Sequence, residues 1–173
     1  LLTQPQTTFE GSYYSVRDAQ FNPKPVQAKL PVWIGGVGER RSIPMAARYA
    51  DGWNAAYVSP RAFARKSAVL DEACERIERD PAELERSINL GFYVKATVVE
   101  AERAKDDFYT AWSNMSPDRD NGMLFGTPDE AVGQIARYVE TGVDLINIAL
   151  RPPYDWDAIQ AFIEDVLPAF PDP

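Results

Sequence analysis

The stretch that decides the fold reads Leu30-Pro-Val-Trp-Ile-Gly-Gly-Val-Gly-Glu-Arg-Arg41, and Ser42-Ile-Pro-Met-Ala-Ala-Arg-Tyr-Ala50 and Asp51-Gly-Trp-Asn54 follow it. A short apolar run between Pro31 and Gly35 is typical of a strand that is buried on both faces. The glycines behind it allow a turn in which backbone N–H groups approach an anion closely. The order therefore predicts a strand, a glycine turn, a helix with Ser42 as its cap, and a second strand.

The same alternation continues along the rest of the chain. Periodicity and turn signals predict strands over residues 31–35, 53–58, 87–99 and 143–150, and helices over residues 42–50, 59–79, 100–112, 127–142 and 155–167. The clearest local signal is Thr127-Pro-Asp-Glu130, a capping box with proline at the first helical position. Residues 113–125 are expected to form a loop.

Four strands that are each followed by a helix imply parallel pairing with right-handed crossovers. The predicted α/β fold is the C-terminal half of a TIM (β/α)8 barrel, because a complete barrel needs about 250 residues and this chain has 173. The chain would hold strands five to eight as a single partial domain over residues 1–173. The alternation alone also allows a small open sheet with helices on both faces.

Residues 9–30 are expected to form an excursion ahead of the first strand. Glu10-Gly-Ser12 is a turn signal between aromatic residues, which predicts a short hairpin over residues 9–16. The prolines at positions 23, 25 and 31 argue against a helix in this region. The start at Leu1 has neither an initiator Met nor a signal-peptide pattern, so we expect further strand–helix units upstream.

Composition narrows the class of function. The formal net charge is −8, which disfavours binding to nucleic acid or to anionic membranes. Cys74 is the only cysteine, which excludes an internal disulfide and a multi-cysteine metal site and favours a reducing, cytoplasmic location. The chain has no histidine, which excludes Ser-His-Asp and Cys-His catalysis within it. We expect no metal, because no cluster of side chains in the sequence has metal-ligand spacing.

The candidate site residues lie where the predicted strands end, because parallel α/β folds place function at the C-terminal ends of their strands. They are Gly35, Gly36, Val37, Gly38, Asn54, Ala55, Lys95 and Arg151. The glycine turn, with a helix behind it and with Arg40 and Arg41 beside it, can present N–H groups and positive charge to a phosphate. The same pattern also fits an ordinary tight turn with solvated arginines.

Three further signals are weaker. A dinucleotide-binding fingerprint fails, because its third glycine position holds Arg41. Lys95 is interpreted as the mark of an exposed strand end. Arg151 follows the last predicted strand and can either bind a phosphate or pair with a surface carboxylate.

Five motifs in register resemble the luciferase-like monooxygenase family, specifically its F420-dependent oxidoreductases. They are Phe9-Glu-Gly-Ser-Tyr-Tyr14, Pro23-Lys-Pro-Val26, Pro31-Val-Trp-Ile-Gly-Gly36, Ala47-Arg-Tyr-Ala-Asp-Gly-Trp-Asn54 and Gly126-Thr-Pro-Asp-Glu130. The resemblance implies a TIM-type barrel that holds a deazaflavin or FMN-type cofactor at its C-terminal face. It also implies hydride transfer to or from a small-molecule organic substrate.

By this resemblance, the turn after the fifth strand helps to hold the cofactor phosphate. That assigns cofactor binding to Gly35, Gly36, Val37 and Gly38, with Arg40 and Arg41 nearby. The family's first four strands, with most of its ring-contacting and proton-transfer residues, have no counterpart here. The catalytic residues are therefore unknown, and the chain alone is expected to be inactive. Coenzyme F420 is the preferred cofactor, and FMN is the alternative.

Two hypotheses of other kinds stay open. The chain could be a non-catalytic half-barrel that binds a phosphorylated ligand or a partner chain, or part of an unrelated barrel enzyme that acts on phosphosugars. A half-barrel leaves two edge strands and an uncovered inner face, so the isolated chain is expected to dimerise, aggregate or remain poorly ordered. The full-length protein is expected to be a homo-oligomer.

Overall fold

The computed structural model describes residues 1–111 and 122–171. It divides into two compact units, Leu1–Val32 and Trp33–Pro173. The first unit contains β1 (Thr7–Glu10) and β2 (Ser15–Ala19), which pair antiparallel. The Gly11 N–H donates to the Tyr14 carbonyl at 2.9 Å and closes the turn between them. The predicted hairpin is therefore present.

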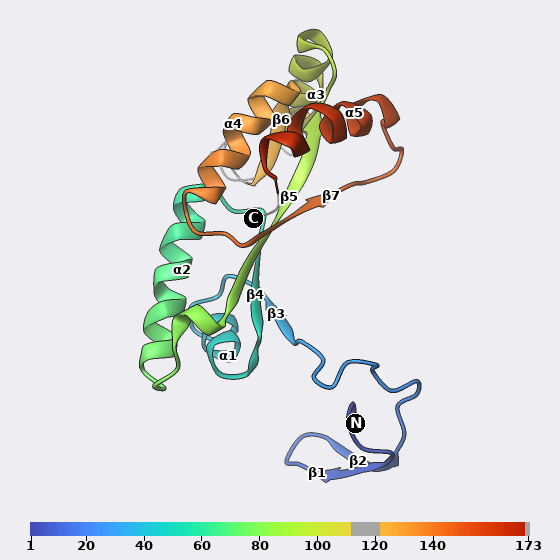
Figure 1. The fold of residues 1–173 in the computed structure, drawn as a ribbon, viewed down its shortest axis with the longest axis vertical. Helices are drawn as coiled ribbons and strands as arrows, with labels where there is room; N and C mark the ends of the chain where they lie inside the picture. The colour runs from blue at the N-terminus through green and yellow to red at the C-terminus, as the bar shows by residue number, and fades with distance from the viewer. Residues whose placement is uncertain (112–121, 172–173) are drawn as a thin grey trace. The chain divides into compact units, whose positions relative to one another are not determined.

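The second unit is built on a parallel sheet (Figure 1). Its strands are β3 (Trp33–Gly35), β4 (Gly52–Ala56), β5 (Glu85–Val94), β6 (Met123–Gly126) and β7 (Leu145–Ala149). Both β4 and β7 pair with Ser87, Ile88 and Asn89 of β5, so they lie on its opposite edges. The short strand β6 pairs with the last residues of β5, from Gly91 to Val94.

Helices connect these strands. They are α1 (Ser42–Tyr49), α2 (Pro60–Glu75), α3 (Val98–Ala111), α4 (Pro128–Val139) and α5 (Trp156–Ala161). A 3-10 turn at Pro81–Glu83 precedes β5, and a π turn at Phe162–Val166 and a 3-10 turn at Leu167–Ala169 follow α5. In the described part of the chain, no helix has the length and apolar character that crossing a membrane requires.

The core lies between one face of the sheet and the helices that cover it. Figure 1 shows α2 and α4 along the same side of the sheet. The buried strand residues include Trp53, Ile88, Leu90 and Leu124, and the helices contribute Ile43, Phe63, Leu70, Ile135 and Val166. The opposite face is only partly covered, since Leu145 and Asn147 of β7 are exposed. This one-sided sheet with alternating helices is the predicted half-barrel architecture.

The third predicted strand extends too far at its C-terminal end. β5 ends at Val94 and α3 begins at Val98, whereas a strand was expected up to position 99. The cause is Thr97, whose hydroxyl accepts from the Glu100 N–H at 3.4 Å and donates to the Glu100 carboxylate at 2.7 Å. This Thr-x-x-Glu pattern starts a helix, and the β-branched Val98 and Val99 concealed it in the sequence.

The predicted loop over residues 113–125 falls mostly outside the described residues. Its end is wrong, because Met123–Gly126 forms β6. The predicted capping box at Thr127 is confirmed, with the Thr127 N–H donating to the Glu130 carboxylate at 2.8 Å. Gly142, which was expected to close α4, has a φ of +77° and follows the end of that helix.

The last predicted helix is interrupted. The five-residue π turn after α5 changes which residues face the core. Phe162 and Val166 are buried, and Phe162 packs edge-on against Phe92 with ring centroids 5.5 Å apart. Ile163 and Leu167, which an uninterrupted helix would place on the same stripe, are about half exposed.

We predict that two neighbouring alanine substitutions in this turn have very different costs. Phe162→Ala should lower the free energy of unfolding by about 3–5 kcal/mol, because it opens a cavity against β5. Ile163→Ala should cost less than about 1 kcal/mol, because its side chain already contacts solvent. Urea unfolding of the natural full-length protein, followed by circular dichroism, measures both values. Equal costs would contradict the π turn.

Candidate functional site

The predicted glycine turn connects β3 to α1. Gly35 is the last residue of β3, and Gly36 has a φ of +119°, a conformation that favours glycine. The Gly36 N–H donates to the Asn54 carbonyl of β4 at 2.9 Å. The Gly38 carbonyl accepts from the Ile43 N–H at 3.0 Å. The turn is thus fixed to the neighbouring strand at one end and to α1 at the other.

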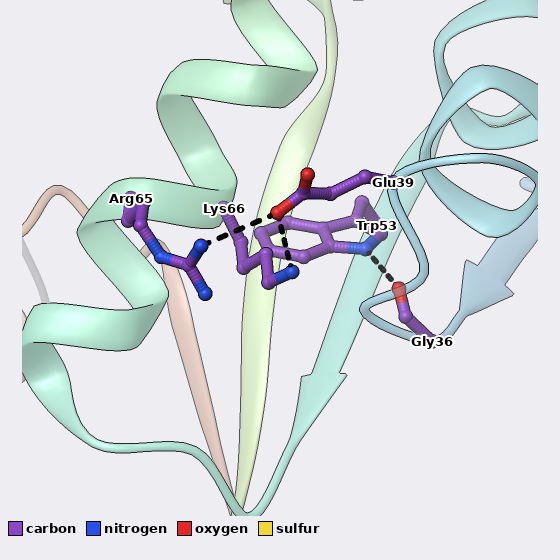
Figure 2. A network of polar contacts seen from close by, with 5 residues as sticks. All are labelled: Gly36, Glu39, Trp53, Arg65 and Lys66. Carbon is purple, nitrogen blue, oxygen red and sulfur yellow. Dashed lines mark hydrogen bonds and ion pairs between the residues drawn. The ribbon is translucent and has the colours of Figure 1, made fainter.

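Trp53 of β4 holds this turn from the core. Its indole Nε1–H donates to the Gly36 carbonyl at 2.8 Å (Figure 2). The indole is completely buried and stacks on Phe63 of α2, with ring centroids 5.4 Å apart. A buried indole donor requires an acceptor, so the position of Gly36 is coupled to the packing of the core. No motif in the sequence predicts this role for Trp53.

Ser42 fills the space beside the turn. A Cβ atom added to Gly36 would lie 2.8 Å from Ser42 Oγ, and one added to Gly38 would lie 3.3 Å from it. The prediction that Ser42 caps α1 is wrong, because Arg41 occupies the N-cap position without a side-chain cap hydrogen bond. Ser42 is the first helical residue and packs its hydroxyl against the two glycines. Side chains at these glycines would therefore displace it.

The turn presents free backbone donors. Among the residues that the structure describes, none accepts a hydrogen bond from the N–H groups of Val37 and Gly38. The Val37 side chain is half-buried and packs against the core, which leaves only its backbone for a ligand. Arg40 and Arg41 are exposed in the same turn, directly before α1. N–H groups, a helix N-terminus and two guanidinium groups form a donor set that suits a phosphate.

Glu39 is an acidic residue within this turn, and α2 neutralises it. Lys66 Nζ lies 2.7 Å from Glu39 Oε1, and Arg65 Nη1 lies 3.5 Å from the same oxygen (Figure 2). The hydrogen bond and the charge of Lys66 hold the pKa of the Glu39 carboxyl below its ordinary value. The two cations offset the charge of Glu39, so the turn is not made repulsive to an anion. The spacing of Glu39 and Lys66 along the chain does not predict this pair.

A row of polar side chains crosses the other face of the sheet. Asn54 Nδ2 donates to Ser87 Oγ at 2.7 Å and to Asn89 Oδ1 at 3.2 Å. The exposed Asn147 is in register with Asn89 on the next strand. Of these residues only Asn54 was predicted, and polar residues at alternate positions of apolar strands are the signal for the others. Ala55, also predicted, is buried in the core instead.

A pocket of about 460 Å³ lies at the C-terminal ends of β5 and β7. Lys95 and Arg151, both predicted candidates, line it together with Asp155. Lys95 Nζ lies 2.5 Å from Asp155 Oδ2, so Lys95 is ion-paired and is not a bare strand end. The hydrogen bond from Lys95, followed by that from the Ala158 N–H, keeps the pKa of Asp155 below its ordinary value. The structure therefore brings the candidate residues together in two groups, the glycine turn and this pocket.

Substituting the buried indole tests how the turn is held. We expect Trp53→Phe to lower the free energy of unfolding by about 1–3 kcal/mol, because it removes the donor to Gly36 and some core volume. Trp156→Phe is the control, because Trp156 is 70% exposed, and should change the free energy of unfolding by less than about 0.5 kcal/mol. Denaturant unfolding of both variants provides the comparison. If Trp53→Phe leaves the free energy of unfolding unchanged, the turn does not depend on the hydrogen bond from Trp53 to Gly36.

The titration of Glu39 tests its pairing. We expect a pKa below 4.5 for Glu39, because Lys66 stabilises the ionised form. The pair should stabilise the folded chain above pH 4.5 and lose that contribution as the pH falls through the lowered pKa. Lys66→Met should raise the pKa of Glu39 more than Arg65→Met, since Lys66 is the larger cause. Carboxyl NMR titration measures these values, and a larger effect of Arg65→Met would contradict the assignment.

Comparison with known proteins identifies a protein family that this chain matches. A family profile described as luciferase-like monooxygenase matches residues 1–123. An uncharacterized protein of Mycobacterium tuberculosis is 28% identical over 140 residues, which are 81% of this chain and 44% of that protein. An F420-dependent glucose-6-phosphate dehydrogenase of Intrasporangium calvum is 25% identical over 97% of this chain and 57% of its own length. The chain thus spans about half the length of these relatives.

Solved structures share the fold. The coenzyme F420-dependent tetrahydromethanopterin reductase of Methanopyrus kandleri superposes with a TM-score of 0.76 at 18% identity, over 98% of this chain and 59% of that one. The oxygenating constituent of 3,6-diketocamphane monooxygenase from Pseudomonas putida, in complex with FMN, superposes with a TM-score of 0.68 at 17% identity, over 99% and 60%. At these identities the likeness concerns the fold alone.

Proposed function

The chain belongs to the luciferase-like monooxygenase family, and on that basis we propose that it is part of an F420-dependent oxidoreductase whose glycine turn binds the cofactor phosphate. The reaction would transfer a hydride between the deazaflavin and an organic substrate. The observation that carries the proposal is the glycine turn itself, with the free N–H groups of Val37 and Gly38 beside two exposed arginines. The chain alone is expected to lack activity.

The residues of the turn fit a phosphate. The backbone of Gly35, Gly36, Val37 and Gly38 would approach it closely, and Ser42 Oγ occupies the space that side chains at Gly36 and Gly38 would need. Arg40 and Arg41 would supply local positive charge in a chain whose net charge is −8. When bound, F420 would donate or accept the hydride. The chain's own contribution would be to bind and orient the cofactor.

The polar row supports the same placement. The Asn54 carbonyl accepts from the Gly36 N–H, so the row begins directly beside the turn. The Asn54 side chain donates to Ser87 and Asn89 and thereby keeps a fixed orientation on the face of the sheet opposite the core. Neutral amides and hydroxyls can hold the polar edge of a ring system, but they are poor proton donors and acceptors at neutral pH. We therefore assign these residues to orientation and not to proton transfer.

FMN is the second candidate cofactor. Its single phosphate would fit the same donors, and a structure with the same fold binds FMN. F420 is preferred because an F420-dependent dehydrogenase is related in sequence to almost the whole chain. The adjacent Arg40 and Arg41 would also suit the longer acidic tail of F420.

Titration of the natural full-length protein with F420 and with FMN, followed by fluorescence, tests this function. We expect F420 to bind more tightly than FMN. Arg40→Ala combined with Arg41→Ala should weaken the preferred cofactor about tenfold or more, since two charge-assisted contacts are lost. The control pair is Arg103→Ala with Arg137→Ala, because both arginines are exposed and lie on α3 and α4, not on the helices α1 and α2 that hold the turn.

Two results would overturn parts of the proposal. Failure of both cofactors to bind would reject the oxidoreductase. Unchanged cofactor affinity in the Arg40 and Arg41 double variant would support the alternative hypothesis, in which the turn is an ordinary tight turn and both arginines are solvated. A preference for FMN would select the alternative cofactor.

A further inference from the structure

The pocket at the ends of β5 and β7 has mostly apolar walls. Its aromatic and thioether lining consists of Tyr57, Phe92, Tyr93, Phe108, Met123 and Tyr154. Met123 lies directly over Gly91, where a Cβ atom would meet its sulfur. A volume of about 460 Å³ is within the range of small-molecule sites, and such walls suit a flat, apolar ligand. None of this lining belongs to the glycine turn.

The segment from Leu150 to Asp155 forms one wall and is held in place. Asp155 Oδ1 accepts from the Ala158 N–H at 3.0 Å and so caps α5, while Asp155 Oδ2 pairs with Lys95. Pro152 and Pro153 restrict the backbone between these contacts and Arg151. The wall is therefore ordered before any ligand arrives, which reduces the entropic cost of binding.

The charges in the pocket do not cancel. Lys95 and Asp155 neutralise each other, and both oxygens of Asp155 are already engaged. Arg151 lines the same pocket, and within residues 1–111 and 122–171 no carboxylate lies within ion-pair distance of it. One positive charge thus remains at the edge of an apolar cavity. The net charge of the chain is −8, so the positive charge of Arg151 contrasts with the negative charge of the chain as a whole.

We propose that this pocket binds the substrate of the oxidoreductase inferred above, and that the substrate is a carboxylic acid with an apolar, ring-sized body whose carboxylate pairs with Arg151. The planar guanidinium matches a carboxylate with two parallel hydrogen bonds. Lys95 contributes indirectly, because it occupies Asp155 and prevents that carboxylate from competing for Arg151. The reaction at this site rests on the proposed function, whereas binding of the acid does not.

Matched acids and amides test the proposal. The natural full-length protein is titrated by calorimetry with benzoate and benzamide, phenylacetate and phenylacetamide, and indole-3-acetate and indole-3-acetamide. At least one acid should bind about tenfold more tightly than its amide, the scale of one charge-assisted pair. Arg151→Gln should reduce that ratio to about one while leaving the affinity for the amide unchanged. Arg61→Gln, at an exposed helical arginine, should leave the ratio as it is.

The outcomes separate this inference from the proposed function. F420 or FMN binding by Arg151→Gln should match that of the unmodified protein, because Arg151 is not part of the glycine turn. A protein that binds a cofactor but binds none of the acids, or shows a ratio that Arg151→Gln does not change, overturns the acid pocket alone. A protein that binds neither cofactor but keeps the Arg151-dependent ratio supports the pocket and rejects the oxidoreductase.

Discussion

The hydrogen bond from the Trp53 indole to the Gly36 carbonyl is the interaction on which the candidate site depends. Trp53 belongs to β4, is completely buried and stacks on Phe63 of α2, so one side chain joins the sheet, a covering helix and the glycine turn. The ion pair between Glu39 and Lys66 ties the same turn to α2 a second time. The backbone that would face a phosphate is therefore positioned by the core and by α2 as well as by contacts within the loop.

The helices cover only one face of the sheet, and this determines where the core and the polar row lie. Helices cover the face that carries Trp53 and Ile88, while the other face carries the polar row that starts at Asn54. Because side chains alternate along each strand, the same short segments supply both the core and the row. The comparisons agree with this arrangement, since the chain covers only about half the length of its curated relatives. An incompletely covered face is what half of a closed barrel presents.

Local signals in the sequence were enough to predict the strand, glycine turn and helix from Pro31 to Ala50, and the capping box at Thr127. Each of these depends on residues within a few positions of one another. The strand is not buried on both faces as expected, because Trp33 and Gly35 are exposed. The features that escaped prediction depend on distant pairing. β6 is a short strand that exists because the end of β5 offers it an edge. The bond from Trp53 and the row through Asn54 need the register of separate strands, which no local pattern contains. Thr97 is the exception, because its capping signal was local and the valines after it were given more weight.

The pairing of β5 also constrains the order in which the chain can fold. β4 precedes β5 and can pair with it early, whereas β7, its partner on the other edge, begins only at Leu145. While the ribosome is still adding residues between Val94 and Leu145, the edge of β5 from Ser87 to Gly91 has no strand to pair with. Open strand edges recruit other chains. The interval between these two strands is thus a period of synthesis in which this edge of β5 is open to pairing with another chain, and the arrival of β7 covers it.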